Sequence, residues 1–255
     1  MARSDKQRAD VLLCERGLAE SRTKAQALIL AGVVYSGEQR IQKPGDLLLP
    51  DIPLSVRERD HPYVSRGGLK LAHALSHFAL SVRGLTCLDI GASTGGFTDV
   101  LLKNGAARVY AVDVGRGQIA DVLRHDPRVT VLERTNARYL NQEQIPEPID
   151  LIVCDASFIS LKTILPAPLA LARPNGMLIT LVKPQFEVGR ENVGKKGVVR
   201  DPALHESVCK TITDWVNQQK GWRVIGLTAS PILGPEGNKE FLLAARRTAP
   251  GPISD

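Results

Sequence analysis

The sequence predicts an α/β protein in which a parallel sheet flanked by helices follows a small α+β unit. Apolar runs of strand length recur between residues 85 and 182 and alternate with helical patterns. One run ends in an acidic residue and a glycine-rich turn, Asp89–Gly96, before an apolar helix pattern begins. Residues 1–60 have a different pattern, with short helices and short strands. The 255 residues suffice for a medium domain and a small one.

The N-terminal unit is predicted to contain two helices and several short strands. The first helix should end at Gly17, and the second should begin after the capping residue Ser21 and end at Gly32. Residues 33–37 then give a strand and a turn, and residues 44–46 give another turn. The apolar side chains expected inside this unit are Ala9, Leu12, Leu13, Ala25, Leu28 and Ile29.

The larger unit is predicted to begin with a helix over residues 65–75 and to continue as alternating strands and helices. Each expected strand is a short apolar run, several of them ending in a polar or charged residue. The expected strands are residues 85–90, 109–112, 129–132, 150–155, 177–182 and 241–244.

The glycine-rich turn has the form D-x-G-x-x-x-G-G, which favours a cofactor site at the start of a helix. The G-x-G-x-x-G spacing of dinucleotide-binding folds and the G-K-[ST] ending of nucleotide hydrolases are both absent. S-adenosylmethionine suits this form, because its amino-acid tail and ribose need a close backbone but no pyrophosphate site. The expected contacts are Asp89, Gly91, Ala92, Ser93, Gly95, Gly96, Phe97, Asp113 and Asn136. The alternative is a purely structural turn, with Asp113 and Asn136 bonded to nearby backbone.

Four charged residues are expected at one edge of the sheet. Asp155 and Lys183 each follow a predicted strand, Glu240 precedes the last strand, and Lys70 lies in the helix before the first. A lysine at the end of a buried strand is costly unless it faces a site or a partner. Each residue taken singly could instead be a solvated surface charge, but their common placement favours a catalytic group. Cys154 is the one candidate nucleophile for base methylation in this region, and its strand position predicts a buried core thiol.

Composition restricts the classes of protein that remain. The net charge of +6 is compatible with an anionic partner, and an aromatic content of 4% argues against a base-stacking platform as the main recognition device. Four scattered cysteines without a C-x-x-C motif fit a reduced cytoplasm and not a structural zinc site. No apolar run reaches membrane-spanning length, and the N-terminus lacks a signal-peptide pattern, so we expect a cytoplasmic protein.

Residues 21–37 resemble the RNA-binding domain named after ribosomal protein S4, in their serine-arginine start, leucine-isoleucine pair and glycine-valine strand entry. The resemblance implies phosphate contacts to folded RNA. The alternative is an exposed basic face on a dimerisation domain. The cations expected to contact RNA, in this domain and beyond it, are Arg8, Arg16, Arg22, Lys24, Arg66, Lys195 and Lys196.

Residues from Tyr63 to about Arg246 resemble the FtsJ-like ribose 2′-O-methyltransferases, and the whole chain resembles the TlyA, or haemolysin A, family of rRNA cytidine 2′-O-methyltransferases. The resemblance implies a Rossmann-like fold, with a seven-stranded sheet whose last strand is antiparallel. It also implies an S4 domain over residues 1–60, a linker over 61–64 and a methyltransferase domain over 65–255. The matching stretches are residues 64–71, 91–97, 132–138, 155–160, 181–187, 230–231 and 234–238.

The implied reaction moves a methyl group from S-adenosylmethionine to a ribose 2′-hydroxyl of cytidine in ribosomal RNA, and needs no metal. We expect Lys183 to be either the neutral base or an ammonium that orients the hydroxyl. Asp155 and Glu240 would orient the lysines, and Lys70 would position the ribose or its phosphate. The glycine-rich loop of residues 188–200 is expected to touch RNA. The sequence does not identify the nucleotide, the ribosomal subunit or the oligomeric state. The competing functions are a non-catalytic RNA-binding protein and a membrane-active haemolysin.

Overall fold

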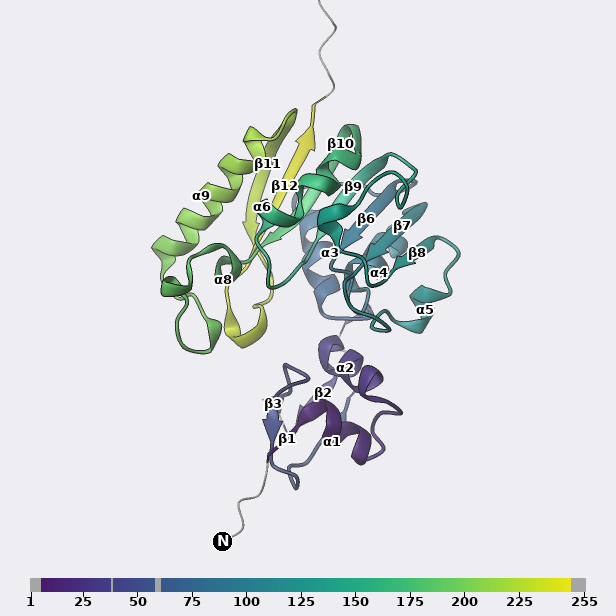
Figure 1. Cartoon of the computed structure of the whole chain (residues 1–255), viewed down its shortest axis with the longest axis vertical. Helices are drawn as coiled ribbons and strands as arrows, with labels where there is room; N and C mark the ends of the chain where they lie inside the picture. The colour runs from purple at the N-terminus through teal and green to yellow at the C-terminus, as the bar shows by residue number, and fades with distance from the viewer. Residues whose placement is uncertain (1–5, 38, 58–60, 249–255) are drawn as a thin grey trace, which may run out of the picture.

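The computed structural model describes residues 6–37, 39–57 and 61–248, which form a small N-terminal α+β domain and a larger α/β domain (Figure 1). The last residue of the expected N-terminal domain, Asp60, lies outside the described residues. The small domain consists of β1 (Gln7–Arg8), α1 (Ala9–Glu15), α2 (Arg22–Ala31), β2 (Val34–Ser36), β3 (Gln39–Arg40), β4 (Leu47–Leu48) and β5 (Ser55–Val56).

The two predicted helices of the small domain are confirmed. The Ser21 hydroxyl accepts a hydrogen bond from the backbone N–H of Lys24 at 3.2 Å, which caps α2 at its start. Gly32 ends this helix in the left-handed conformation, with φ of +80°. The inward faces of α1 and α2 pack against β2 in one apolar core, which contains Ala9, Leu13, Ala25, Ile29, Val34 and Ile41.

The large domain is built on a seven-stranded sheet in the order β11-β12-β10-β9-β6-β7-β8. Five strands, β10, β9, β6, β7 and β8, are parallel to one another, whereas β12 is antiparallel to both of its neighbours, β10 and β11. The predicted fold class is therefore confirmed. The strands are β6 (Thr86–Ile90), β7 (Arg108–Val112), β8 (Val129–Leu132), β9 (Ile149–Cys154), β10 (Ala172–Val182), β11 (Trp222–Ala229) and β12 (Phe241–Arg247).

Helices cover both faces of this sheet, and each face has its own apolar core. Neighbouring residues of one strand point to opposite cores: Cys87 and Leu151 face α3, α4 and α5, whereas Leu88 and Ile152 face α6, α7 and α9. The helices are α3 (Gly67–His77), α4 (Gly96–Lys103), α5 (Asp121–Arg124), α6 (Leu161–Ile164), α7 (Pro166–Leu171), α8 (Pro184–Glu187) and α9 (Pro202–Gln218). The short 3₁₀ turns are η1 (Ala137–Tyr139), η2 (Arg190–Asn192), η3 (Lys195–Gly197) and η4 (Pro235–Gly237).

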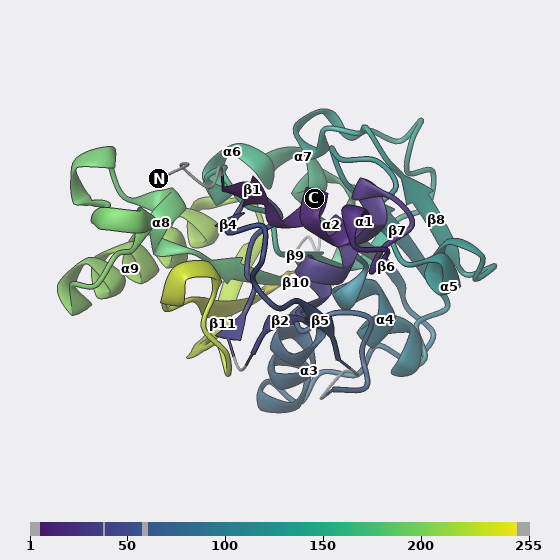
Figure 2. The same cartoon turned by 90° about the horizontal axis from the view of Figure 1, so that it is seen from below.

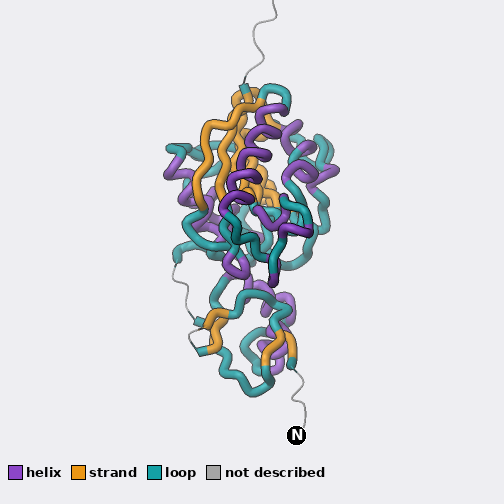
Figure 3. Tube along the Cα trace, turned by 90° about the vertical axis from the view of Figure 1, so that its left-hand side faces the viewer, coloured by secondary structure: helices purple, strands orange, loops and turns teal. Residues whose placement is uncertain are grey.

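The small domain lies beyond the carboxyl ends of the parallel strands (Figures 1 and 3). Seen from below, it covers the middle of the large domain (Figure 2). Lys24 forms an ion pair with Asp121 at 3.1 Å, and Lys43 forms one with Glu236 at 2.8 Å. The Gln42 side-chain oxygen also accepts a hydrogen bond from the backbone N–H of Glu236 at 3.1 Å. These contacts place the small domain over the edge of the sheet where the candidate site lies.

Candidate active site

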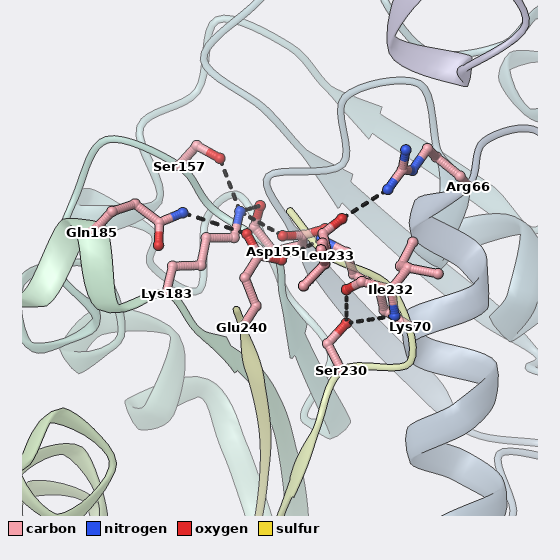
Figure 4. Close-up of polar contacts among 10 residues, drawn as sticks. All are labelled: Arg66, Lys70, Asp155, Ser157, Lys183, Gln185, Ser230, Ile232, Leu233 and Glu240. Atoms are coloured by element: carbon pink, nitrogen blue, oxygen red, sulfur yellow. Dashed lines mark hydrogen bonds and ion pairs between the residues drawn. The ribbon is translucent and has the colours of Figure 1, made fainter. Parts of the chain in front are cut away.

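The four charged residues expected at one edge of the sheet do converge (Figure 4). Lys70 Nζ lies 2.6 Å from Glu240 Oε2 and 3.7 Å from Asp155 Oδ2. Lys183 Nζ lies 2.6 Å from Asp155 Oδ1. The carboxylate of Asp155 thus lies between the two ammonium groups, and the four side chains form one connected charge network. All four are largely withdrawn from solvent, with side-chain exposures of 9% or less for all but Asp155, which is 18% exposed.

The fold brings these residues together because parallel strands end at the same edge. Asp155 follows β9, and its backbone N–H donates to the carbonyl of Ile90 at 3.0 Å, at the end of the neighbouring strand β6. Lys183 follows β10 and caps the short helix α8. Glu240 precedes β12, and its carboxylate lies close to Gly234: a Cβ on Gly234 would stand 2.1 Å from Glu240 Oε1, so a larger residue there would displace the carboxylate.

Lys183 Nζ makes two hydrogen bonds in addition to its ion pair with Asp155. Besides the Asp155 carboxylate, its Nζ donates to the backbone carbonyl of Asp155 at 3.2 Å and to Ser157 Oγ at 2.9 Å. Each of these three atoms can accept a hydrogen bond. The geometry therefore suits a protonated Lys183, fixed in direction by one loop of the chain.

For both Asp155 and Lys70, burial and the neighbouring charges shift the pKa in opposite directions. Burial alone would raise the pKa of Asp155, but Lys183 and Lys70 together hold it below its usual range. Burial alone would lower the pKa of Lys70, but Asp155 and Glu240 raise it above its usual range. Asp155 is therefore ionised and Lys70 protonated at neutral pH.

The glycine-rich turn lines the same cavity as the charge network. The cavity is bordered by residues 91–94, 96 and 97 of the turn, by residues 65 and 66 before α3, by Gly67 and Lys70 of α3, and by Asp155 and Lys183. It extends to the small domain, which contributes Leu30, Arg40 and Gln42 among others. The turn and the catalytic candidates thus share one site between the two domains.

The physical reason for two of the glycines differs from the one expected. Gly91 and Gly95 have φ of +78° and +91°, so the turn needs their conformational freedom. However, a Cβ on Gly91 would stand 3.0 Å from the Cα of Ala156, and one on Gly95 would stand 2.3 Å from a methyl carbon of Leu123. The space that a Cβ would take at these two positions is therefore occupied by the protein itself, and contact of either glycine with S-adenosylmethionine stays a prediction.

Three polar residues expected at the cofactor make other contacts in the structure. Asp89 is fully buried and accepts a hydrogen bond from the Thr98 hydroxyl at 2.6 Å, at the start of α4. Burial raises the pKa of Asp89 to about 7. Asp113 accepts from the backbone N–H groups of Ser93 and Gly115, at 2.8 and 2.7 Å. It therefore ties the turn to the next strand, and contact with a ribose stays a prediction.

Asn136 also makes the local contact that was the alternative interpretation. Its side-chain oxygen accepts a hydrogen bond from the backbone N–H of Arg138 at 3.1 Å and caps the turn η1. Its role at the cofactor stays a prediction. The remaining residues expected at the cofactor line the cavity, with the exception of Gly95: Gly91, Ala92, Ser93, Gly96 and Phe97.

The cations expected to contact RNA lie in five separate places on the two domains. Arg8 and Arg22 both bind the buried carboxylate of Asp10, at 2.9 and 3.2 Å, with guanidinium groups that stay about half exposed. Arg16 donates to the backbone carbonyls of Pro50 and Ile52.

The other four predicted RNA contacts lie nearer the large domain. Lys24 binds Asp121 across the domain boundary, and Arg66 donates to the carbonyl of Leu233 at 2.7 Å. Lys195 and Lys196 are exposed on η3. Contact of these residues with RNA stays a prediction.

Three residues around the network were missed from the sequence. Ser157 binds Lys183, and Gln185 donates weakly to Glu240 at 3.5 Å. Phe158 is 90% exposed, has a left-handed backbone with φ of +65°, and lies 5.1 Å from Phe186, centroid to centroid. An exposed aromatic ring held in an uncommon backbone conformation beside a charge network is a signal that sequence patterns do not carry.

Cys154 is a core residue, as expected. Its side chain is fully buried, and burial raises the pKa of the thiol to about 11. A thiol nucleophile acts as the thiolate, so this cysteine is protonated and inaccessible at neutral pH. The alternative of cysteine-dependent base methylation has no support from this geometry.

Within residues 6–37, 39–57 and 61–248, no group of three histidine, cysteine or acidic side chains is arranged to hold a metal ion. In the same ranges, none of the helices has the length and apolar character needed to cross a membrane.

Comparison with known proteins gives two family matches. The FtsJ-like methyltransferase profile matches residues 63–247, and the S4 domain profile matches residues 7–51. "Putative rRNA methyltransferase YqxC" of Bacillus subtilis is 52% identical, over 94% of this chain and 85% of that protein. "16S/23S rRNA (cytidine-2'-O)-methyltransferase TlyA" of Mycobacterium tuberculosis is 49% identical, over 94% and 89%.

A solved structure agrees with both matches. "Putative hemolysin from Streptococcus thermophilus" superposes with a TM-score of 0.74 at 44% identity, over 96% of this chain and 90% of that one.

Proposed function

The chain belongs to the FtsJ-like methyltransferase family, and from this premise we propose that it transfers a methyl group from S-adenosylmethionine to the ribose 2′-hydroxyl of cytidine in ribosomal RNA. The observation that carries the proposal is the network of Lys70, Asp155, Lys183 and Glu240, which shares one cavity with the glycine-rich turn. That cavity is bordered by a domain of the S4 type. A methyl donor, a ribose hydroxyl and an RNA backbone would meet there.

The cavity residues fit S-adenosylmethionine. Residues 91–94, 96 and 97 of the turn line the cavity at the start of α4, and most of their side chains are small, so a ligand can approach the backbone there. Ser65, Gly67 and the turn would hold the amino-acid part of the molecule. When bound, it supplies an electrophilic methyl group. The residues of the chain would then position the hydroxyl and take up its proton.

Lys183 is the residue that we place at the hydroxyl. Its ammonium group, held by Asp155 and Ser157, would orient the oxygen. If Nζ first releases one proton to bulk water, the neutral amine can accept the hydroxyl proton as the methyl group is transferred. Asp155 fixes both lysines. Lys70, bound to Glu240 at 2.6 Å, would stay protonated and attract the ribose or the adjoining phosphate.

The target base would lie outside the charge network. The exposed ring of Phe158 packs against the half-buried ring of Phe186 beside Lys183, and exposed aromatic rings stack on unpaired bases. S4-type contacts by Arg8, Arg22 and the cations of the large domain would bind backbone phosphates around the target. The four cysteines are free, and we propose a cytoplasmic location, where reduced thiols and ribosomal RNA occur together.

We also propose domain limits near residues 1–60 and 61–248. Within the expected linker of residues 61–64, two side chains pack on the large domain. The backbone N–H of Val64 donates to Asp99 at 2.9 Å, and the Tyr63 ring fills the space beside Gly68. A separate methyltransferase domain should therefore begin no later than residue 61.

The test is to incubate the purified full chain with radiolabelled S-adenosylmethionine and with unmodified 16S and 23S rRNA transcribed in vitro. The labelled nucleotide is then mapped by nuclease digestion and mass spectrometry. Label on the ribose of a cytidine supports the proposal and identifies the subunit. Label on a base refutes the 2′-hydroxyl chemistry. RNA binding without any label would favour a non-catalytic RNA-binding protein.

A further inference from the structure

Two arginines from different domains lie side by side at the mouth of the catalytic cavity. Arg40 ends β3 of the S4 domain, and Arg66 precedes the first helix of the methyltransferase domain. Both line the cavity that also contains Lys70, Asp155 and Lys183. Their stems lie against the same residue: a Cβ built on Gly32 would stand 3.0 Å from Arg66 Cδ and 3.8 Å from Arg40 Cδ.

This pair of guanidinium groups lacks a compensating charge in the part of the chain that the structure describes. Arg66 Nη2 donates to a neutral acceptor, the Leu233 carbonyl, at 2.7 Å (Figure 4). The backbone of Arg40 pairs with Tyr35 of β2, but its side chain makes neither a hydrogen bond nor an ion pair with any residue in the described ranges. Two other cations near the boundary between the domains do have acidic partners: Lys24 binds Asp121, and Lys43 binds Glu236. Two like charges held close together in a partly enclosed cavity repel each other, and an anion bound between them relieves this repulsion.

We propose that Arg40 and Arg66 together bind a single backbone phosphate of the RNA, beside the ribose that is methylated. This proposal rests on the proposed function and names a substrate contact within it. A phosphodiester group has two non-bridging oxygens, so one oxygen can face each guanidinium group, and arginine suits such planar, charge-assisted contacts. Arg40 belongs to an RNA-binding domain by its family match, which favours RNA over other anions.

The arrangement couples RNA docking to the position of the two domains. The ion pairs that join the domains involve largely exposed side chains, and such pairs contribute little to stability. A phosphate held by one arginine from each domain would add a bond across the boundary only when RNA is present. The RNA itself would therefore hold the S4 domain over the catalytic cavity.

The experiment compares Arg40→Ala, Arg66→Ala and the double variant with the wild type, using full-length protein and unmodified rRNA transcribed in vitro. Arg83→Ala is the matched control, because Arg83 is exposed and lies just before β6, at the opposite edge of the sheet. Three quantities are measured: kcat/KM for methyl transfer, the dependence of RNA affinity on salt concentration, and the calorimetric Kd for S-adenosylmethionine.

Each single variant should lower kcat/KM about 10- to 100-fold, the usual effect of losing a charge-assisted hydrogen bond. The double variant should lose less than the product of the two single losses, because both arginines act on one phosphate. The slope of log K against log salt should become shallower by about 0.7 to 0.9 in the double variant, the value for one phosphate contact, and by less in each single variant, where one guanidinium group still faces the phosphate. Arg83→Ala should match the wild type, and the Kd for S-adenosylmethionine should stay unchanged.

Several results would overturn the proposal. A double variant whose loss is the product of the single losses, with twice the change in slope expected for one phosphate, would mean two separate phosphates. A weakened Kd for S-adenosylmethionine would mean that the pair binds the carboxylate of the methyl donor. An unchanged slope would mean that the pair binds no phosphate. Arg40→Lys and Arg66→Lys are the controls for misfolding. They keep the positive charge, so they should keep the wild-type slope.

The salt dependence needs no catalysis, so it separates this proposal from the proposed function. A wild-type protein that transfers no methyl group to rRNA would refute the function. The slopes of the variants would still decide whether the two arginines share a phosphate.

Discussion

Removal of the Lys183 amine is the most direct perturbation of the network. In Lys183→Ala, Asp155 loses its partner at 2.6 Å and keeps Lys70 at 3.7 Å. Breaking a buried ion pair usually costs about 3 to 5 kcal/mol. Because Lys70 still compensates the charge of Asp155, we expect the free energy of unfolding to fall by about 3 kcal/mol. A positioned acid or base contributes about 10² to 10⁴ to a rate. We therefore expect kcat to fall by at least about 10², in a protein that is destabilised but folded.

The assay measures three properties of Lys183→Ala: single-turnover ribose methylation, the calorimetric Kd for S-adenosylmethionine and the unfolding free energy in urea. Lys210→Ala is the matched control, because Lys210 is an exposed lysine on α9 that pairs only with the exposed Asp214 among the described residues. Methylation should collapse in Lys183→Ala while the Kd changes little, and the control should resemble the wild type.

Lys183→Arg separates the two roles that remain open for this residue. An arginine stays protonated and its planar fork cannot replace a compact amine, so activity should fall almost as far as in the alanine variant. Robust methylation by Lys183→Ala would refute the assignment of this residue. Robust methylation by Lys183→Arg alone would exclude a neutral base and leave an orienting cation.

The remaining predictions concern the turn, a buried acid and the core thiol. Gly91→Ala should lose about 1 to 3 kcal/mol of unfolding free energy in urea and bind S-adenosylmethionine more weakly than the wild type. Gly84→Ala has a similar φ of +74° but open space around its Cβ, so a loss no larger in Gly91→Ala would contradict the contact with Ala156. Burial raises the pKa of Asp89 to about 7, so the folded state binds more protons than the unfolded state between about pH 4 and 7. The unfolding free energy of the wild type, relative to Asp89→Asn, should therefore fall as pH rises through this window, and a pH-independent difference would show that Asp89 is ionised throughout. Cys154→Ser should keep ribose methylation within a few fold, whereas an inactive variant that still binds the methyl donor would return cysteine-dependent base chemistry to consideration.

Sequence patterns predicted the central sheet and the charge network for the same physical reason. A strand buried on both faces is a continuous apolar run, and the first polar residue after it marks the edge of the sheet. Asp155 and Lys183 could therefore be placed without coordinates. The strand over residues 222–229 could not be located in this way, because β11 is an edge strand whose exposed side chains include Ile225 and Leu227. Its alternation of buried and exposed positions does not match an alternation of apolar and polar residues.

The glycine-rich turn shows where a motif identifies a site but not its contacts. The pattern of small residues predicted a turn that a ligand could approach, and the turn does line the cavity. Which residues face the ligand depends on the neighbours of the turn, such as Ala156 and Leu123, which are distant in sequence. Asp113 is a comparable case, since its two backbone hydrogen bonds depend on how the turn and the next loop fold together.

The position of Arg40 depends on a still longer-range relation, the docking of one domain on another. In the sequence Arg40 is one cation in a short polar strand. Nothing in the neighbouring residues 33–48 distinguishes it as a binding residue. It becomes a candidate only because Gly32 leaves space for two arginine stems and Arg66 fills the other half of that space. A functional pair divided between domains has no fixed spacing in sequence, so its detection requires the structure of both domains together. The salt dependence of the Arg40 and Arg66 variants therefore tests the docked arrangement as well as the phosphate site, because a shared phosphate requires both arginines at one place.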